Sequence, residues 1–409
     1  MILLLIHPLL DRSFKTKRNL YSAKKWLYIG IFILGIFQFI GAKANTDCEP
    51  VSWPLWNSFK MHFIKPDGRV VAGSSPQFQS FSEGQSYAMV FALIANDPKT
   101  FDLIWRWSLA NLANNNIDSR LPAWAWGKAD DGTWKVLDEN SASDADLWYA
   151  YALLEAGRHW QRIDYTEDAK KILALIENKS IITLPGLGKM MLPAPFGFTL
   201  SPDQWQLNPS YLPIPVLRRL AQNDKSSPWS EIANNTVKMI AAVSPKGLAP
   251  NWVNYQAISP TAGQFYIDSD KGDLGSYDAI RVYLWAGMTS TQDPLAKPLM
   301  KSLVGMSKII QLNGLPPESV STETGSSSGV APLGFSSALV PYLKTSNKQI
   351  LLQSQLERGK LLQYSSEPPI YYDYVLSLFG MGWIENRYQF SNNGQINLNW
   401  NSICTQKIS

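Results

Sequence analysis

Three observations in this 409-residue chain predict an all-α fold, an (α/α)6 barrel in a single domain. Apolar residues recur at intervals of three and four along most of residues 84–379, which is the spacing of one helix face. Short acidic motifs stand where three of these helices begin, and the second interval between them is a little over twice the first. The composition, 45% apolar and 12% aromatic, is sufficient to bury a large core.

The apolar spacing predicts eleven or twelve helices, separated by loops that contain Gly and Pro. Two stretches that combine polar and aromatic residues, 134–137 and 264–267, are expected to be small strands or hairpin loops. Residues 319–329 are rich in Ser and Gly, so a flexible surface loop is expected there. The predicted helices cover residues 84–95, 98–113, 144–160, 165–178, 212–222, 229–243, 276–288, 294–311, 334–344, 347–363 and 368–379.

Three segments place a carboxylate one or two residues behind a serine at a predicted helix start. They are Ser82–Gln85, Ser143–Asp146 and Ser276–Asp278. Serine followed three residues later by glutamine is a capping-box pattern, so Ser82 and Gln85 are expected to cap one another's backbone. Glu83, Asp144 and Asp278 are therefore expected in first helical turns.

The separations of these motifs predict a ring of helix hairpins. Glu83 and Asp144 are 61 positions apart, and Asp144 and Asp278 are 134 apart, a little over twice as far. At about 60 residues per hairpin, the roughly 365 residues after the N-terminal segment form six hairpins. Inner helices that all run one way would place the three carboxylates in one cleft. An α-solenoid is the alternative, but no sequence repeat supports it.

Residues 1–44 are predicted to be a signal peptide. A basic region that ends at Lys24-Lys25 precedes the 16-residue apolar run 26–41, and Ala42-Lys43-Ala44 fits a cleavage motif. The run is short for a membrane span of about 20 residues, although an uncleaved anchor stays an alternative. Residues 45–409 are expected to form one catalytic domain that is periplasmic or secreted, with no stable membrane insertion after cleavage.

The charge distribution does not predict a nucleic-acid partner. The net charge of +4 arises in residues 1–44, which hold seven Lys and Arg against one acid. The remaining 365 residues hold 30 basic and 32 acidic side chains, so the exported part is close to neutral.

Cysteine and histidine usage bears on redox state and on metals. Cys48 and Cys404 stand near the two ends of the exported chain, so a disulfide is expected in an oxidising compartment, with two free buried thiols as the alternative. The three histidines, His7, His62 and His159, are far apart in the sequence. We therefore predict no zinc or other histidine-bound metal site.

Glu83 is the candidate general acid, and the alternative is a carboxylate that only favours the positive end of a helix. A helix start stabilises the ionised form, so a proton donor at this position needs burial or a second carboxylate to raise its pKa. Asp144 and Asp146 are two residues apart and point roughly 200° apart on a helix, so only one can face the cleft. Asp278 and Arg281 share a helix face, either as a simple ion pair or with the arginine holding an ionised base.

These motifs together resemble glycoside hydrolase family 8, most closely the periplasmic endoglucanases of bacterial cellulose synthase operons. The Ser-Asp-Ala-Asp signature at 143–146 is the most specific part. The resemblance extends from Trp53 to Trp383 and implies an (α/α)6 barrel, in agreement with the spacing of the acidic motifs. The matching segments are 82–87, 121–127, 140–148, 153–158, 208–213 and 276–283.

The resemblance also implies a role for each candidate residue. Glu83 matches the proton donor, and Asp278 matches the base of an inverting mechanism. Asp144 matches the first aspartate of the signature, which is described either as a nucleophile or as a residue that holds the sugar. Residues that match positions lining the glycan cleft are Trp126, Tyr211, Tyr277 and Arg281.

By this resemblance, the chain is expected to be an exported endo-β-1,4-glucanase that cuts cellulose chains internally without a cofactor. Its implied partners are β-1,4-glucan chains and the cellulose synthase complex. Family 8 also contains chitosanases and xylanases, which stay open. A non-catalytic glucan-binding or assembly factor of a cellulose secretion system is another alternative, although a binder would not need Glu83 and Asp278 together.

Overall fold

The computed structural model describes residues 51–72, 78–224, 226–268, 270–364 and 368–400. All of them belong to one of the chain's two compact units, residues 46–409. The predicted signal peptide and the proposed Cys48–Cys404 disulfide lie outside the described residues. Within the described ranges, no helix is both long enough and apolar enough to cross a membrane.

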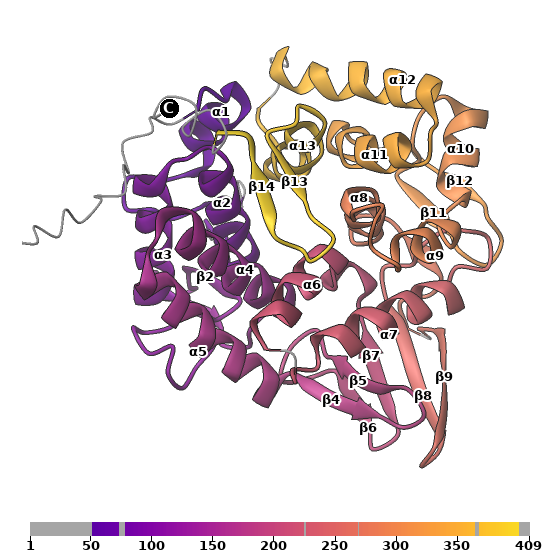
Figure 1. Ribbon diagram of the computed structural model, residues 1–409, viewed down its shortest axis with the longest axis horizontal. Coiled ribbons are helices and arrows are strands. Elements are labelled where there is room, and N and C mark those ends of the chain that lie inside the picture. Colours follow the sequence, from indigo (N-terminus) through magenta and orange to yellow (C-terminus); the bar gives the residue numbers. More distant parts are fainter. Residues whose placement is uncertain (1–50, 73–77, 225, 269, 365–367, 401–409) are drawn as a thin grey trace, which may run out of the picture. The chain divides into compact units, whose positions relative to one another are not determined.

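The described residues form the predicted (α/α)6 barrel, in which helices alternate between an inner and an outer layer (Figure 1). The inner helices are buried on most sides, whereas the outer helices bury mainly one face. The inner layer consists of α2 (Ser82–Ile94), α4 (Ser143–Trp160), α6 (Ile214–Asn223), α8 (Ala279–Met288), α11 (Leu333–Thr345) and α13 (Tyr371–Ile384). The outer layer consists of α1 (Pro54–Phe63), α3 (Pro98–Asn111), α5 (Ile163–Lys179), α7 (Trp229–Ala242), α9 (Ala296–Lys301), α10 (Gly305–Asn313) and α12 (Gln349–Lys360). The single helix predicted over 294–311 is thus two short helices, α9 and α10.

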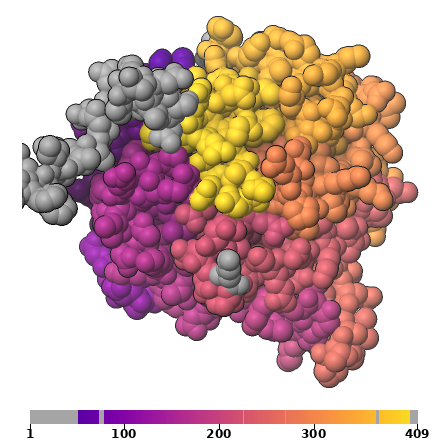
Figure 2. Space-filling model, in the orientation of Figure 1, coloured from indigo at the N-terminus to yellow at the C-terminus, as the bar shows by residue number. Residues whose placement is uncertain are grey.

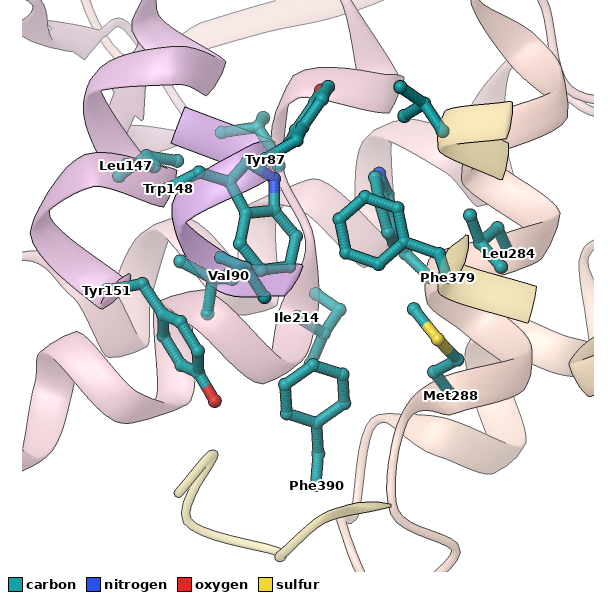
Figure 3. Close-up of a cluster of buried hydrophobic side chains, with 14 of the residues drawn as sticks. Tyr87, Val90, Leu147, Trp148, Tyr151, Ile214, Leu284, Met288, Phe379 and Phe390 are labelled. Atoms are coloured by element: carbon teal, nitrogen blue, oxygen red, sulfur yellow. The ribbon is translucent and has the colours of Figure 1, made fainter. Parts of the chain in front are cut away.

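Aromatic side chains at the centre of the barrel join the inner helices. Phe379 of α13 packs edge-on against Phe91 of α2, with ring centroids 4.6 Å apart. Trp148 of α4 and Trp285 of α8 lie 5.3 and 5.2 Å from the same phenylalanine ring. Figure 3 shows Trp148 and Phe379 turned toward one another within this cluster. Each aromatic pair contributes about 0.5–1.5 kcal/mol beyond the area it buries, so one cluster stabilises four of the six inner helices.

A C-terminal hairpin of β13 (Tyr388–Phe390) and β14 (Ile396–Leu398) packs over one end of the inner helices (yellow in Figures 1 and 2). Figure 3 shows Phe390 of this hairpin pointing toward the central cluster. Glu155 of α4 is fully buried and accepts a hydrogen bond from the Ile396 backbone nitrogen at 2.9 Å. Arg158 and Arg219 pair with the same carboxylate. A buried carboxylate needs such partners, so this cluster ties the hairpin to α4 and α6.

Short strands lie on the connections between helices. The stretches predicted at 134–137 and 264–267 are confirmed as parts of β3 and β9. Within the described residues, three sheets have more than two strands, in the orders β1-β2-β3, β6-β7-β8-β9 and β10-β11-β12. The strands before the C-terminal hairpin are β1 (Ser80–Phe81), β2 (Ala125–Lys128), β3 (Trp134–Asp138), β4 (Ile181–Leu184), β5 (Gly188–Met191), β6 (Thr199–Ser201), β7 (Gln204–Leu207), β8 (Val253–Ser259), β9 (Ala262–Ile267), β10 (Leu274–Gly275), β11 (Ser319–Ser321) and β12 (Ser327–Ser328).

Two local predictions are wrong. Segment 319–329 is a hairpin rather than an irregular loop, because β10 offers a strand edge to β11 and Val320 is buried on pairing. The capping box is absent from α2, whose N-cap is Phe81. The buried Gln85 side chain instead accepts from the Val70 backbone nitrogen at 2.5 Å and donates to Ser108 at 3.2 Å. Burial between helices thus redirects the amide from the helix end to tertiary partners.

We predict that Gly380→Ala destabilises the barrel. Helix α13 approaches α11 so closely at Gly380 that an added Cβ would overlap the carbonyl oxygen of Ser337. Alanine gains about 1 kcal/mol in helix propensity, but overpacking costs about 1–3 kcal/mol, so a net loss in the free energy of unfolding is expected in urea titrations. Ser354→Ala on the exposed face of α12 is the control and should stay within about 0.5 kcal/mol. Equal stability of the Gly380 variant and the native chain would contradict the close approach.

Candidate active site

The structure brings the three predicted carboxylates to one end of the barrel, where α2, α4 and α8 begin. Glu83 lies in the first turn of α2 and Asp144 in the first turn of α4. Asp278 is the N-cap of α8, one residue before the helix rather than in its first turn. The positions agree with the spacing argument, because inner helices that begin at one end place their first residues together.

The guanidinium of Arg281 connects two of these carboxylates. Its Nη2 donates to Asp278 Oδ1 at 2.7 Å, and its Nη1 lies 3.4 Å from Asp144 Oδ2. Nη2 also donates to Ser210 Oγ at 2.9 Å, and only 8% of the arginine is exposed. The pair with Asp278 is therefore more than an ion pair within one helix. One buried cation orients acids from two different helices.

The carboxyl group of Glu83 has its own set of donors. Trp124 Nε1 donates to Glu83 Oε1 at 3.2 Å, and Ser82 Oγ donates to Oε2 at 3.3 Å. One helical turn further along α2, the Tyr87 hydroxyl donates to Asp144 Oδ2 at 3.3 Å. Residues four apart on a helix share a face, so Tyr87 places a second polar group of α2 next to the acids.

Burial sets the protonation of these acids. It raises the pKa of Glu83 to about 8, with a further rise from the negative charge of Asp144. Backbone N–H groups at the helix start, the Arg281 charge and the Trp124 hydrogen bond act in the opposite direction but are weaker. Burial also raises the pKa of Asp144 to about 6, against the effect of Arg281. Glu83 is thus largely protonated at neutral pH, as a proton donor must be.

Asp144 and Asp146 face different surroundings, as their spacing predicts. Asp144 contacts Tyr87 and Arg281. Asp146 is fully buried, and neither of its carboxylate oxygens makes a hydrogen bond of normal geometry to another described residue. Burial raises the pKa of Asp146 well above its usual range, and the nearby Ser141 hydroxyl opposes only part of that rise. Asp146 is therefore an internal group whose burial favours the protonated form.

A cavity of about 250 Å3 lies beside the acids and has aromatic walls. Trp124, which bonds Glu83, and Tyr211, whose ring centroid is 5.6 Å from the Arg281 guanidinium, both line it. Phe198 and Trp252 also line the cavity, with their rings stacked 5.8 Å apart and nearly parallel. Flat aromatic faces of this kind suit the stacking of sugar rings.

Two of the predicted cleft residues, Trp126 and Tyr277, do not line this cavity. Trp126 on β2 stacks on Trp134 at 5.2 Å, with the Arg69 guanidinium 5.2 Å from the Trp126 ring. Trp124, two residues earlier, is the tryptophan that bonds Glu83. Tyr277 is 47% exposed, and its hydroxyl donates to Glu318 at 3.1 Å.

The sequence-based prediction of the site omitted several residues. Trp124 and Tyr87 stand inside the family-like segments 121–127 and 82–87, so membership of those segments was an available signal. Trp252 and Tyr372 stand outside every motif. The Tyr372 hydroxyl donates to the Tyr277 carbonyl oxygen at 2.5 Å, immediately before Asp278.

The sequence model described as "Glycosyl hydrolases family 8" matches residues 29–386, a range that includes Glu83, Asp144 and Asp278. The chain belongs to glycosyl hydrolase family 8. It is therefore a glycoside hydrolase, and the carboxylates at the helix starts stand in the part of the chain that defines the family.

Family 8 relatives cover almost the whole chain. An endoglucanase from Pseudomonas fluorescens (strain SBW25) is 44% identical over 386 residues, covering 91% of this chain and 96% of the relative. An endoglucanase from Escherichia coli (strain K12) is 39% identical over 370 residues, covering 90% and 97%. The crystal structure of an endo-1,4-D-glucanase from Vibrio fischeri ES114 is 38% identical and covers 85% of this chain and 99% of that chain, with a TM-score of 0.78.

We predict that Asp146→Asn removes a pH-dependent loss of stability. A carboxyl whose pKa is raised in the folded state stabilises the fold below its unfolded pKa of about 3.9 and loses that contribution as pH rises toward the folded pKa. The variant should therefore gain stability relative to the native chain between pH 5 and pH 8, by up to about 1.4 kcal/mol per pH unit, in urea titrations. Asp118→Asn, at an exposed carboxylate, is the control and should follow the native profile. Parallel profiles for Asp146→Asn and the native chain would show that Asp146 is ionised in the fold.

Proposed function

We propose that this family 8 glycoside hydrolase is an endo-β-1,4-glucanase that cuts internal β-1,4-glucosidic bonds of cellulose by an inverting mechanism. The observation that carries the proposal is a protonated acid, Glu83, at one end of the barrel with Asp278, a carboxylate that Arg281 holds. The aromatic cavity beside these groups suits a glucan chain. Relatives at 44% and 39% identity that are named endoglucanases support the choice of substrate.

Glu83 would act as the general acid. Its raised pKa of about 8 keeps the proton on the carboxyl group at neutral pH, where it can pass to the glycosidic oxygen as the bond to the anomeric carbon breaks. Trp124 donates to Oε1 and fixes the orientation of the carboxyl group. After proton transfer, the same hydrogen bond stabilises the carboxylate.

Asp278 would act as the general base. Its Oδ1 accepts from Arg281, and this bond would orient the carboxylate toward a water on the face of the sugar opposite Glu83. The water would attack the anomeric carbon while Asp278 takes its proton. Inversion requires the two carboxyl groups to be about 6.5–9.5 Å apart, so that the water fits between base and sugar.

Asp144 would hold the sugar whose bond is cut. Its Oδ1 accepts from the Ala145 backbone nitrogen at 2.9 Å, and Oδ2 faces Tyr87 and Arg281. These contacts fix the carboxyl group at the junction of α2, α4 and α8. The negative charge of Asp144 also helps to raise the pKa of Glu83, so the residue would support the acid electrostatically.

We further propose that residues 1–44 are a signal peptide and that residues 45–409 act as the catalytic domain in the periplasm or outside the cell. The basic and apolar pattern of the N-terminus supports export. The resemblance to endoglucanases of cellulose synthase operons supports a role beside a cellulose synthase complex, on newly made glucan.

Glu83→Gln should abolish hydrolysis while cellohexaose still binds. The amide keeps the shape of the side chain but has no proton to transfer, so kcat on carboxymethyl cellulose should fall by well over 10²-fold. Reducing-sugar release measures turnover, and calorimetry measures binding. Glu167→Gln, at an exposed carboxylate of α5, should keep full activity. Near-normal turnover by the Glu83 variant would remove Glu83 from the role of acid.

Asp278→Asn should also remove activity, and the native enzyme should release the α-anomer first. A single attack by water inverts the β-configuration, whereas a covalent intermediate would retain it. Proton NMR during the hydrolysis of cellohexaose, at times shorter than mutarotation, distinguishes the two. Initial release of the β-anomer would contradict the inverting mechanism and point to a nucleophile such as Asp144.

A further inference from the structure

A second cavity of about 650 Å3 lies among the outer helices. It is near the C-terminal ends of the inner helices α8 and α11, whereas the carboxylates are at the N-terminal ends of inner helices. Its walls come from α9, α10, the last turn of α11 and the start of α12, which lie together in the orange part of Figure 1. Tyr342 and Thr345 are near the end of α11, and Thr291 follows the end of α8. The carboxylates are at the starts of inner helices, so this groove is at the opposite end of the barrel from the substrate cleft.

The groove is strongly basic. Four exposed lysines line it: Lys297 and Lys301 of α9, Lys308 of α10, and Lys348 before α12. Among the residues that the structure describes, no Asp or Glu lines the groove, and none of these lysines forms an ion pair. Residues 45–409 carry nearly equal numbers of acidic and basic side chains, so this cluster is a local excess of charge. Unneutralised lysines repel one another, and an anionic partner would relieve that repulsion.

The floor of the groove is apolar and adaptable. Ala296 and Tyr342 are buried beneath it, Met300 is partly exposed, and Val304 is 43% exposed. A methionine side chain adjusts its shape to different apolar partners. The combination of an apolar floor with charged walls fits an amphipathic chain segment better than a fully polar ligand.

The choice of lysine also bears on the ligand. Arginine binds phosphate and single carboxylates through a rigid bidentate fork, whereas lysine presents a point charge on a flexible stem. Arginine is absent from the described lining of this groove, and its four ammonium groups come from three separate segments. This arrangement fits several carboxylates spaced along a peptide, each with its own lysine.

We propose that this groove binds an acidic, amphipathic peptide segment of a partner protein. Glutamate or aspartate side chains of the segment would face the four lysines, and its aliphatic side chains would pack on Met300 and Val304. Because the groove is at the end of the barrel away from the carboxylates, a bound partner would leave the substrate cleft open. The proposal does not depend on which glycan the enzyme hydrolyses.

The test uses the full exported chain and a fluorescent twelve-residue peptide of alternating Glu and Leu. Binding is followed by anisotropy at low salt, with the corresponding Gln-Leu peptide as the uncharged probe. Replacing Lys297, Lys301, Lys308 and Lys348 by Glu should weaken binding of the acidic peptide at least tenfold. The matched control reverses four exposed lysines elsewhere, Lys99, Lys128, Lys170 and Lys271, and should change the Kd less than twofold.

Each outcome decides the proposal. Selective loss with the groove variant, together with weak binding of the Gln-Leu peptide, supports it. Equal loss in the two sets of variants, or no binding by the native chain, overturns it. Tighter binding of pyrophosphate or of anionic lipid vesicles through the same lysines would assign the groove to phosphate groups and overturn the peptide partner. If the variant with four Glu residues melts at a lower temperature than the control variant, peptide binding is measured instead with Gln at the same four positions.

Discussion

The buried guanidinium of Arg281 makes the interactions on which the candidate active site depends. It bonds Asp278 at the start of its own helix and faces Asp144 and Tyr87 from two other inner helices. A cation with so little exposure is stable only with anionic and polar partners, and the acids are equally costly to bury without it. The barrel brings the starts of three inner helices together, and Arg281 supplies the positive charge that their buried acids need there.

Charge and burial then separate the acids into different states. The Arg281 charge lowers the pKa of Glu83 less than burial raises it, so this pKa is about 8. Asp278, in contrast, accepts a hydrogen bond directly from the arginine. Asp146 is buried and makes no hydrogen bond to Arg281, and its burial raises its pKa and favours the protonated form. Similar side chains thus acquire different functions from their surroundings. The aromatic walls supply the low-polarity environment on which this separation depends.

The opposite end of the barrel has a second buried charge cluster with a structural purpose. Glu155, paired with Arg158 and Arg219, holds the C-terminal hairpin against the inner helices. The central aromatic residues lie between the two clusters, so five of the six inner helices, all except α11, take part in at least one of these clusters. Such a rigid frame suits catalysis, because carboxyl groups must keep their positions to within a fraction of an ångström.

The sequence by itself determined the helical periodicity, the number of hairpins, the family and the three carboxylates, because these depend on local spacing and short motifs. The tertiary structure alone decided which groups surround those carboxylates. The Gln85 side chain bonds residues of other segments instead of capping its own helix. The serine-rich residues 319–321 form a strand because they pair with the edge of β10. Trp252 and Tyr372 joined the site from distant positions without any motif. Burial and pKa arise from contacts between distant segments, and no local pattern in a sequence records those contacts.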